Sequence, residues 1–271
     1  MRLQQIVRYP IKSCRGTDVP RARVGARGLE HDRRWMVVDA AGRFVTQRTA
    51  PRLAQVDVAL EGDRLRVSHP TQADLVLPAL LHDGPRAAVE VWGSPVEACV
   101  DREGSAWMSA LLGDPLRLVC MPDDAKRPVD PAYGRNGDIV SFADGFPLLL
   151  TSESSLDDLS RRAGMPLEMS RFRPNLVVAG APAWAEDGWP ELEVGPLRFR
   201  APKPCARCVI TTLDPRTGEA GKEPLRTLAS FRRREGGVMF GINLVPELAP
   251  DASVELVVGA AVSASAPLAP G

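Results

Sequence analysis

Short runs that alternate apolar and polar residues are the strongest constraint on how this chain folds. RLRVSH (64–69), AAVEVWGSPVEACV (87–100) and ELEVGPLRFRA (191–201) place every second side chain on one face, as half-buried antiparallel strands do. RRWMVVDAAGRFVTQR (33–48) joins two apolar runs across a glycine-containing turn, which predicts a hairpin. Since 25 prolines and 23 glycines are available for turns, we expect a mainly β protein.

Three segments have the apolar spacing and the end signals of short helices. Residues 152–164 begin with acids and end with arginines and a glycine, an order that the helix dipole favours. The other two segments are residues 105–115, which stop at Gly113, and residues 223–237, which end in Arg232, Arg233 and Arg234. The expected fold class is therefore mainly β with a few helices, an α+β arrangement.

One long segment divides the chain. Residues 120–138, CMPDDAKRPVDPAYGRNGD, are polar, rich in proline and glycine, and without periodicity. Such a stretch is either a linker or a functional loop. We predict a first domain over 1–120, a linker or functional loop over 121–137, a second domain over 138–262 and a flexible tail over 263–271.

The charge balance and the cysteines limit the possible partners and compartments. With 34 basic and 34 acidic residues, no overall attraction to nucleic acid or to an anionic membrane is expected, so an anion must be met by a local basic cluster. No apolar run approaches the roughly 20 residues of a membrane span. The odd, scattered set of Cys14, Cys99, Cys120, Cys205 and Cys208 does not resemble a disulfide framework, so we expect a cytoplasmic protein.

The segment KPCARCVITTLDP (203–215) is the sharpest chemical signal. Cys205 and Cys208 flank Arg207, and the β-branched run 209–212 that follows predicts a strand. A thioredoxin-like motif would open a helix instead, and structural zinc needs four ligands where this motif supplies two. A cation beside a thiol favours the thiolate, which is a soft ligand for a polarisable metal.

Basic and polar groups elsewhere are candidates to complete an anion site, because arginine holds phosphate with a planar fork and lysine as a point charge. Taken singly, most are explained as solvated surface charges. Arg173 differs, because its place before Pro174 and an apolar run suggests a side chain that points into a cleft. The candidates are Lys12, Ser13, Arg33, Arg34, Arg48, Arg173 and Asn175. We expect four cations, Lys12, Arg33, Arg173 and Arg207, to converge on one cleft.

No other catalytic pattern is present in the sequence. The three histidines lie far from any serine or cysteine motif, and His31 is expected to be exposed. Nucleophile-elbow, Walker and dinucleotide-binding motifs are absent. Asp144, Glu186 and Asp187 lie in turn sequences, where we expect them to cap or stabilise turns.

Seven motifs together resemble one family. They occur here in the family's order and are YPIKSC, HDRRW, GRFVTQRTAPRLAQV, SFADGFPLLLTSESSL, RFRPNLVV, KPCARCVITTLDP and FGINL. From about residue 1 to about residue 250 the chain is similar to two-domain MOSC proteins, named after the domain shared with the C-terminal part of molybdenum cofactor sulfurase. Within that family it resembles the mitochondrial amidoxime-reducing component and its bacterial counterparts.

The resemblance implies a fold and a cofactor. The fold would be an antiparallel MOSC N-terminal β-barrel domain packed beside a MOSC β-barrel domain. The cofactor would be the molybdenum cofactor, Mo-molybdopterin, with Cys208 as metal ligand and catalytic residue and Cys205 as a nearby structural residue. Ala206 stands where some relatives have serine, so one hydroxyl contact would be lost. The cofactor-binding residues implied are Lys12, Ser13, Arg33, Ser152, Arg173, Asn175, Arg207 and Cys208.

The resemblance also implies an activity. Relatives reduce N-hydroxylated small molecules, such as amidoximes and hydroxylamines, by two electrons. The donor would be an external ferredoxin- or cytochrome-type protein, since this sequence has no four-cysteine cluster pattern; nucleic acid and membrane are not expected partners. An alternative is a sulfur- or molybdenum-cofactor carrier that uses a Cys208 thiolate or persulfide without redox turnover of its own. A third is a binding module without catalysis.

Overall fold

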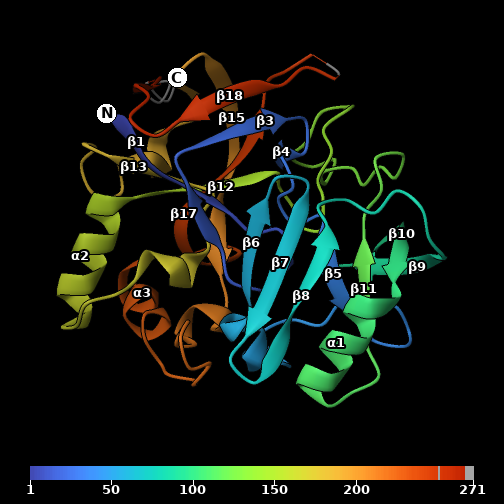
Figure 1. Ribbon diagram of the computed structural model, residues 1–271. Helices are drawn as coiled ribbons and strands as arrows, with labels where there is room; N and C mark the ends of the chain where they lie inside the picture. Colours follow the sequence, from blue (N-terminus) through green and yellow to red (C-terminus); the bar gives the residue numbers. More distant parts are fainter. Residues whose placement is uncertain (250, 266–271) are drawn as a thin grey trace.

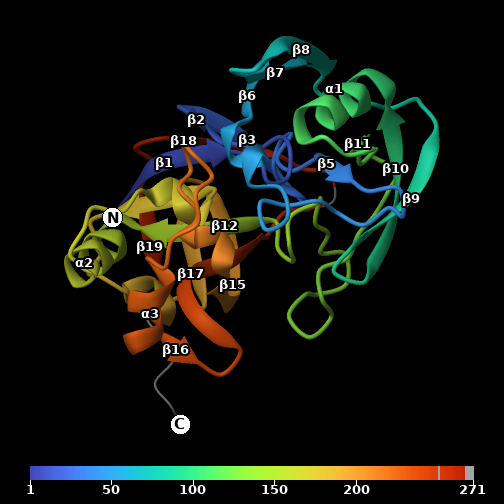
Figure 2. The same ribbon diagram turned by 90° about the horizontal axis from the view of Figure 1, so that it is seen from below.

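Two lobes lie side by side in the computed structural model, which describes residues 1–249 and 251–265. One lobe holds the largest sheet with helices α2 (Glu153–Ala163) and α3 (Leu225–Phe231), and the other holds two smaller sheets with α1 (Arg102–Leu112) (Figure 1, Figure 2). Most strand pairs are antiparallel. The expected mainly β, α+β fold class is thereby confirmed.

The largest sheet has nine strands in the order β19-β14-β15-β17-β12-β13-β1-β2, with β16 paired to β17. Only β12 and β13 run parallel, and α2 lies in their connection, since parallel neighbours need a long crossover. The strands are β1 (Arg2–Arg8), β2 (Thr17–Val19), β12 (Leu148–Ser152), β13 (Leu176–Ala179), β14 (Glu191–Val194), β15 (Leu197–Arg207), β16 (Arg233–Arg234), β17 (Gly237–Pro246) and β19 (Val262–Ala264).

Three smaller sheets complete the fold, in the orders β5-β11-β10-β9, β6-β7-β8 and β18-β3-β4. All four sheets are open, so the expected β-barrels are not closed among the described residues. The remaining strands are β3 (Arg21–Gly25), β4 (Gly28–Leu29), β5 (Trp35–Val38), β6 (Asp57–Glu61), β7 (Arg64–His69), β8 (Gln72–Pro78), β9 (Arg86–Val91), β10 (Ser94–Asp101), β11 (Arg117–Cys120) and β18 (Val254–Val257). Short 3-10 helices are η1 (Pro51–Gln55), η2 (Met169–Phe172), η3 (Ala185–Gly188) and η4 (Val209–Thr212).

Burial follows the apolar patterns of the strands. The central strands β12 and β13 are buried at every position, as strands covered on both faces are, whereas β14 alternates between exposed and buried. Beneath α2 and α3, Phe172 stacks on Phe240 with ring centroids 3.9 Å apart. Because Phe172 ends η2, this packing fixes the position of the next residue, Arg173.

The three expected helices are confirmed, with one difference at the last. α1 ends at Gly113 and α2 at Gly164, each glycine being left-handed. α3 instead ends before the three arginines, of which Arg233 and Arg234 form β16. The hairpin expected over 33–48 turns as predicted, but its second arm pairs with β5 only around Phe44, and β11 is the main partner of β5.

The strand expected over 209–212 is wrong, because these residues form η4. Two hydroxyls explain the difference: Thr211 Oγ1 donates to the carbonyl of Cys208 at 3.0 Å and Thr212 Oγ1 donates to that of Val209 at 2.8 Å. Such local bonds compete with a strand ladder and outweigh the β propensity of the run. Consequently β15 ends directly before Cys208.

Two strands of the first 29 residues pair with strands of the C-terminal half: β1 pairs with β13, and β3 pairs with β18. The division at 120 and 138 stays a prediction. Of the tail predicted from 263, residues 263 and 264 belong to β19, and 266–271 lie outside the described residues. Among the described helices, none combines the length and apolarity needed to cross a membrane.

Candidate functional site

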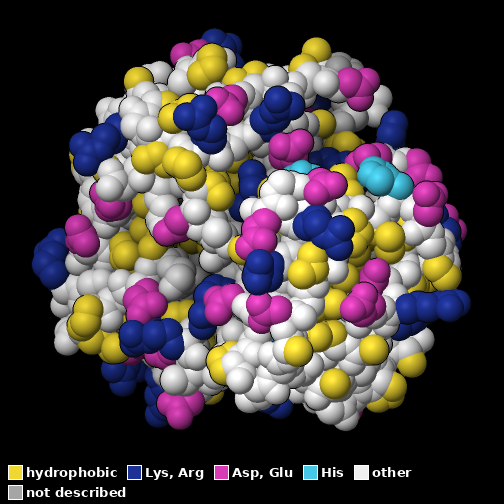
Figure 3. Space-filling view, in the orientation of Figure 1, with side chains coloured by type: hydrophobic (Ala, Val, Ile, Leu, Met, Phe, Trp, Pro, Cys, Tyr) yellow, Lys and Arg dark blue, Asp and Glu magenta, His cyan; other side chains and the backbone are white. Residues whose placement is uncertain are grey.

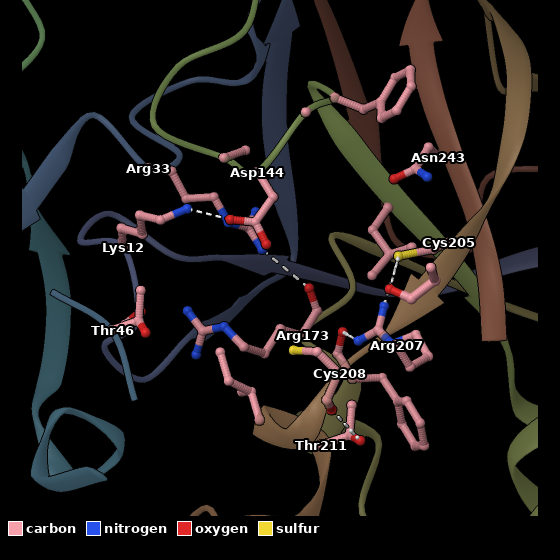
Figure 4. Close-up of a pocket in the computed structure, with 18 of the residues that line it drawn as sticks. Lys12, Arg33, Thr46, Asp144, Arg173, Cys205, Arg207, Cys208, Thr211 and Asn243 are labelled. Atoms are coloured by element: carbon pink, nitrogen blue, oxygen red, sulfur yellow. Dashed lines mark hydrogen bonds and ion pairs between the residues drawn. The ribbon is translucent and has the colours of Figure 1, made fainter. Parts of the chain in front are cut away.

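A pocket of about 820 Å³, which includes the solvent at its mouth, collects residues from both halves of the sequence. Its lining comes from the loops after β1 and on both sides of β5, the loop before β12, the end of η2 and the end of β15 (Figure 4). Seven of the eight residues implied as cofactor-binding line it: Lys12, Ser13, Arg33, Arg173, Asn175, Arg207 and Cys208. Ser152 does not; it is fully buried, with its hydroxyl 3.4 Å from that of Ser154.

The arginine that contacts Cys208 is not the one that the sequence suggested. Arg48 Nη2 donates to Cys208 Sγ at 3.1 Å, whereas Arg207 Nη1 donates to Cys205 Sγ at 2.9 Å. The expectation that Arg207 lies beside the Cys208 thiol is therefore wrong. The reason is geometric: along a strand, residues two apart share a face and adjacent residues point to opposite faces.

Three arginines of the pocket, Arg48, Arg173 and Arg207, have no carboxylate within ion-pair distance in the described part of the chain. Arg173 donates to the carbonyl of Cys14 at 2.7 Å, and burial lowers its pKa. Arg173 Nη2 and Arg207 Nε are buried and lack a hydrogen-bond partner among these residues. Because an unpaired buried charge is costly, this arrangement suits an anionic ligand.

Two other cations of the pocket, Lys12 and Arg33, lie within ion-pair distance of a carboxylate. Lys12 Nζ lies 2.5 Å from Asp144 Oδ1 and donates to the carbonyl of Phe142 at 2.8 Å. Burial alone would raise the pKa of Asp144, but Lys12 outweighs this effect and holds that pKa well below its usual range. The Asp144 side chain is still 64% exposed, because it faces the open pocket. Buried Arg127, from the predicted linker, donates to the carbonyl of Asp144 at 2.8 Å and so fixes this loop.

Tyr9 connects two arginines of the pocket. The guanidinium carbons of Arg33 and Arg173 lie 4.5 Å and 4.4 Å from the centroid of its ring. Both arginines have left-handed backbones, with φ of 48° and 55°, which are held by contacts such as the bond from Arg33 Nη2 to the carbonyl of Arg173 at 3.1 Å. A Cβ on Gly16 would come within 2.3 Å of the ring, so only glycine leaves room for it.

Asn175 forms side-chain hydrogen bonds that hold the wall of the pocket together. Its Oδ1 accepts from Arg33 Nη1 at 3.0 Å and from the Leu149 amide at 3.2 Å, and its Nδ2 donates to the carbonyl of Val7 at 3.2 Å. These bonds join β1, β12 and the loop of Arg33. Asn175 therefore orients Arg33, while Arg33 Nη1 also lies 2.5 Å from Asp32.

Comparison with known families identifies the chain. A model of the MOSC N-terminal beta barrel domain matches residues 1–115, and a model of the MOSC domain matches residues 137–263. The chain belongs to the MOSC family. The family resemblance seen in the motifs is thereby confirmed.

Relatives of this MOSC protein share roughly a third of its residues. Mitochondrial amidoxime-reducing component 1 of Homo sapiens is 37% identical over 239 residues, which cover 83% of this chain and 70% of the human protein. Its Xenopus laevis namesake is 32% identical over 249 residues, or 87% and 73% of the two chains. Molybdenum cofactor sulfurase of Oryza sativa subsp. japonica is 32% identical over 279 residues, covering 95% of this chain and 34% of the sulfurase.

Sequence reasoning did not assign two pocket residues of this MOSC protein. Asp144 was expected to stabilise a turn, and Arg48 was one anion-site candidate among several. Neither position carries a local signal, because Asp144 meets Lys12 across 132 residues and Arg48 meets Cys208 across 160.

Two other expectations from the sequence are wrong. Arg34 lies outside the pocket and donates to the carbonyl of Met121 and to the carboxylate of Asp123. His31 is half-buried rather than exposed.

Outside the pocket, the surface carries both basic and acidic side chains. Basic and acidic side chains are interspersed over the face shown in Figure 3, in keeping with a net charge of zero. The excess of cations in the pocket is therefore a local feature, as a site for an anion requires.

Proposed function

We propose that this MOSC protein binds the molybdenum cofactor in the pocket and reduces N-hydroxylated compounds by two electrons. The proposal is carried by one observation: the Cys208 thiol, which accepts from Arg48, lines the same pocket as Arg173 and Arg207, and none of these arginines has a carboxylate partner among the described residues. A phosphorylated pterin that carries molybdenum offers an anion to arginines and a soft metal to a thiolate. The names of the relatives support a cofactor of this kind.

The residues present fit this group. Buried donors on Arg173 and Arg207 are unused within the described chain, as an anion-binding wall would leave them. The described residues contain no cluster of three or more histidine, cysteine or acidic side chains that could hold a bare ion. A single thiolate therefore suits a metal that arrives with its other ligands attached.

Seven of the lining residues have proposed roles in holding the cofactor. Cys208 is the metal ligand and the catalytic residue. Arg173 and Arg207 bind the anionic part of the cofactor, and Asn175 orients Arg33. Ser152 is left out because its side chain is buried away from the pocket. The remaining cofactor-binding residues are Lys12, Ser13 and Arg33.

When bound, the cofactor supplies two-electron redox chemistry at molybdenum. The chain supplies position: Cys208 fixes the metal at the end of β15, and the arginines fix the pterin. Asp144 is ionised at neutral pH because of its low pKa, so it balances Lys12 and does not act as a general acid. Reduction of an N–OH group to N–H consumes two electrons and two protons and releases water. We expect the electrons from an external ferredoxin- or cytochrome-type donor, the protons from solvent, and the cytoplasm as compartment.

The test measures the molybdenum and pterin content of the protein and its rate of substrate reduction. We expect protein purified from a host that makes the cofactor to contain molybdenum and pterin in near one-to-one ratio with the chain. Reduced viologen dye should then drive reduction of an amidoxime or hydroxylamine. Cys208→Ala, produced in the same way, is the control for reduction by free dye. Equal rates for parent and control over several N-hydroxylated substrates would refute the reductase.

A second candidate is a carrier of sulfur or of the cofactor, and the exposure of Cys208 favours it. The thiol is only half-buried and opens onto a pocket, so a sulfur donor can reach it. The relative named molybdenum cofactor sulfurase belongs to the same family. Trapping a persulfide on Cys208 in protein that lacks stable molybdenum would favour the carrier over the reductase.

A further inference from the structure

One aromatic side chain is held in a strained position beside the pocket. Trp92 is at the tip of the β9–β10 hairpin and is 54% exposed. Its φ is 51° and that of Gly93 is 79°, so both residues of the turn are left-handed. A turn of this type favours Asn-Gly, since a bulky side chain is strained there. Strain of this kind, where it is observed, points to a use for the side chain.

The contacts of Trp92 fix its ring against the pocket. Its Nε1 donates to Asp144 Oδ1 at 3.1 Å, and the guanidinium of Arg48 lies 5.1 Å from its ring. The ring of Phe44 packs at 5.1 Å with a tilt of 60°. Asp144 and Arg48 both line the pocket, and Arg48 also contacts the sulfur of Cys208. The indole thus extends the pocket wall outward while its remaining surface is open to solvent.

The other four tryptophans do not share this position. Trp35 and Trp189 are buried, and Trp107 and Trp184 are half-buried. The indole of Trp35 donates to the carbonyl of Ala79, and that of Trp107 to the carbonyl of Ala73. These residues serve packing, whereas most of Trp92 contributes nothing to a core.

We propose that Trp92 determines substrate specificity, by stacking against a flat aromatic substituent of the molecule whose polar group enters the pocket. The proposal rests on the proposed function, because it names the substrate class of that same site. Aromatic rings stack offset on an indole face, and the cations behind Trp92 attract an oxygen-bearing group on the same molecule. A planar aromatic compound with one such polar group matches both features, and a small aliphatic one matches only the second.

The first test needs no metal. Benzoate and acetate carry the same anionic group and differ by a ring, so calorimetric titration of the purified full chain measures what the ring contributes. We expect the parent to bind benzoate about tenfold more tightly than acetate. Trp92→Phe, which keeps a ring but loses the N–H, should retain most of this preference. Trp92→Asn, which tolerates the left-handed turn, should lose it.

Two results of this titration would overturn the proposal. One is a parent that binds both anions equally, and the other is a Trp92→Asn variant that keeps the preference of the parent. Thermal melting of each variant shows whether the hairpin still folds. Since the probes are simple anions, this result does not depend on whether the protein is a reductase.

The second test uses the molybdenum-loaded protein and reduced viologen. Trp92→Asn should raise the KM of an aromatic N-hydroxylated substrate about tenfold more than that of an aliphatic one. An equal rise for both substrates would assign Trp92 a structural role and refute the proposal. If the loaded parent turns over neither substrate, the proposed function fails, while the benzoate titration still decides the role of Trp92.

Discussion

The cations of the pocket fall into two groups that differ in how their charge is balanced. In the paired group, Lys12 has Asp144, Arg33 has Asp32 and Arg171 has Asp214. In the unpaired group, Arg48, Arg173 and Arg207 contact sulfur, carbonyl or aromatic groups, with no carboxylate among the described residues. Figure 4 shows Lys12, Arg33 and Asp144 together on one side, and Cys205, Arg207 and Cys208 on the other.

This difference separates the cations whose charge the chain balances from those whose charge the described residues leave unbalanced. The paired group satisfies its own charges, so it stabilises the loops before β5 and β12 with or without a ligand. In the unpaired group the described residues offer no carboxylate to the arginines, so a bound anion would balance their charge. A ligand is therefore expected against Arg173, Arg207 and Cys208, and the following predictions test that division.

The largest effect is expected at the two cysteines. Cys208→Ala should lose essentially all bound molybdenum, because it removes the proposed ligand. Cys205→Ala should keep most of it, because Cys205 contacts Arg207 and not the proposed metal. Mass-spectrometric metal analysis of both proteins, purified identically, measures the difference. Similar metal contents in the two variants would show that the ligand is misassigned.

The two arginines that share Tyr9 should differ in their effect on stability. Arg33→Gln leaves Asp32, which is 2% exposed, without its cation, and should lower the free energy of unfolding by about 3 kcal/mol. Arg173→Gln removes a positive charge that has no carboxylate partner among the described residues. The free energy of unfolding should therefore change by less than about 1 kcal/mol. Urea denaturation in phosphate-free buffer measures both values.

Titration with an anion tests directly whether Arg173 contributes to an anion site. Pyrophosphate should raise the melting temperature of the parent by binding only the folded state. Arg173→Gln should lose most of that rise, since Arg173 lines the pocket and has no carboxylate partner among the described residues. A rise as large as that of the parent would mean that the unpaired group does not bind the anion.

A smaller, pH-dependent effect is expected in the paired group. The folded pKa of Asp144 lies below its unfolded value of about 3.9, so its stabilising effect is present above about pH 4 and is lost as the pH falls further. Asp144→Asn should lower the free energy of unfolding by about 1 kcal/mol or less at pH 7, since solvent screens this exposed carboxylate. The difference from the parent should shrink between pH 4 and pH 3, and denaturation curves at several pH values would show a constant difference if the prediction is wrong.

The smallest effect is expected at the residue that joins the two groups. Tyr9→Phe keeps the ring on which Arg33 and Arg173 lie and removes only the phenol, for which the described residues offer no hydrogen bond. Its free energy of unfolding should stay within about 0.5 kcal/mol of the parent. A loss as large as that of Arg33→Gln would show that the phenol, and not the ring, organises the arginines.

The sequence by itself predicted those features that depend on near neighbours. Alternation with a period of two identified β14 and the strands β9 and β10, and the acid-to-arginine order with Gly164 identified α2. Motif order identified the MOSC family and pointed to Cys208. Secondary-structure patterns can be recognised in the sequence because the side chains that decide a strand or a helix lie within about four residues of each other.

Only the tertiary structure decided which charged and aromatic groups meet. Arg48 reaches Cys208 across 160 residues and Lys12 reaches Asp144 across 132, and no periodic pattern links such positions. The structure also placed Trp92 against Asp144 and excluded Ser152 from the pocket. Contacts of this kind depend on how loops are carried by packed sheets, and that packing is a property of the whole chain.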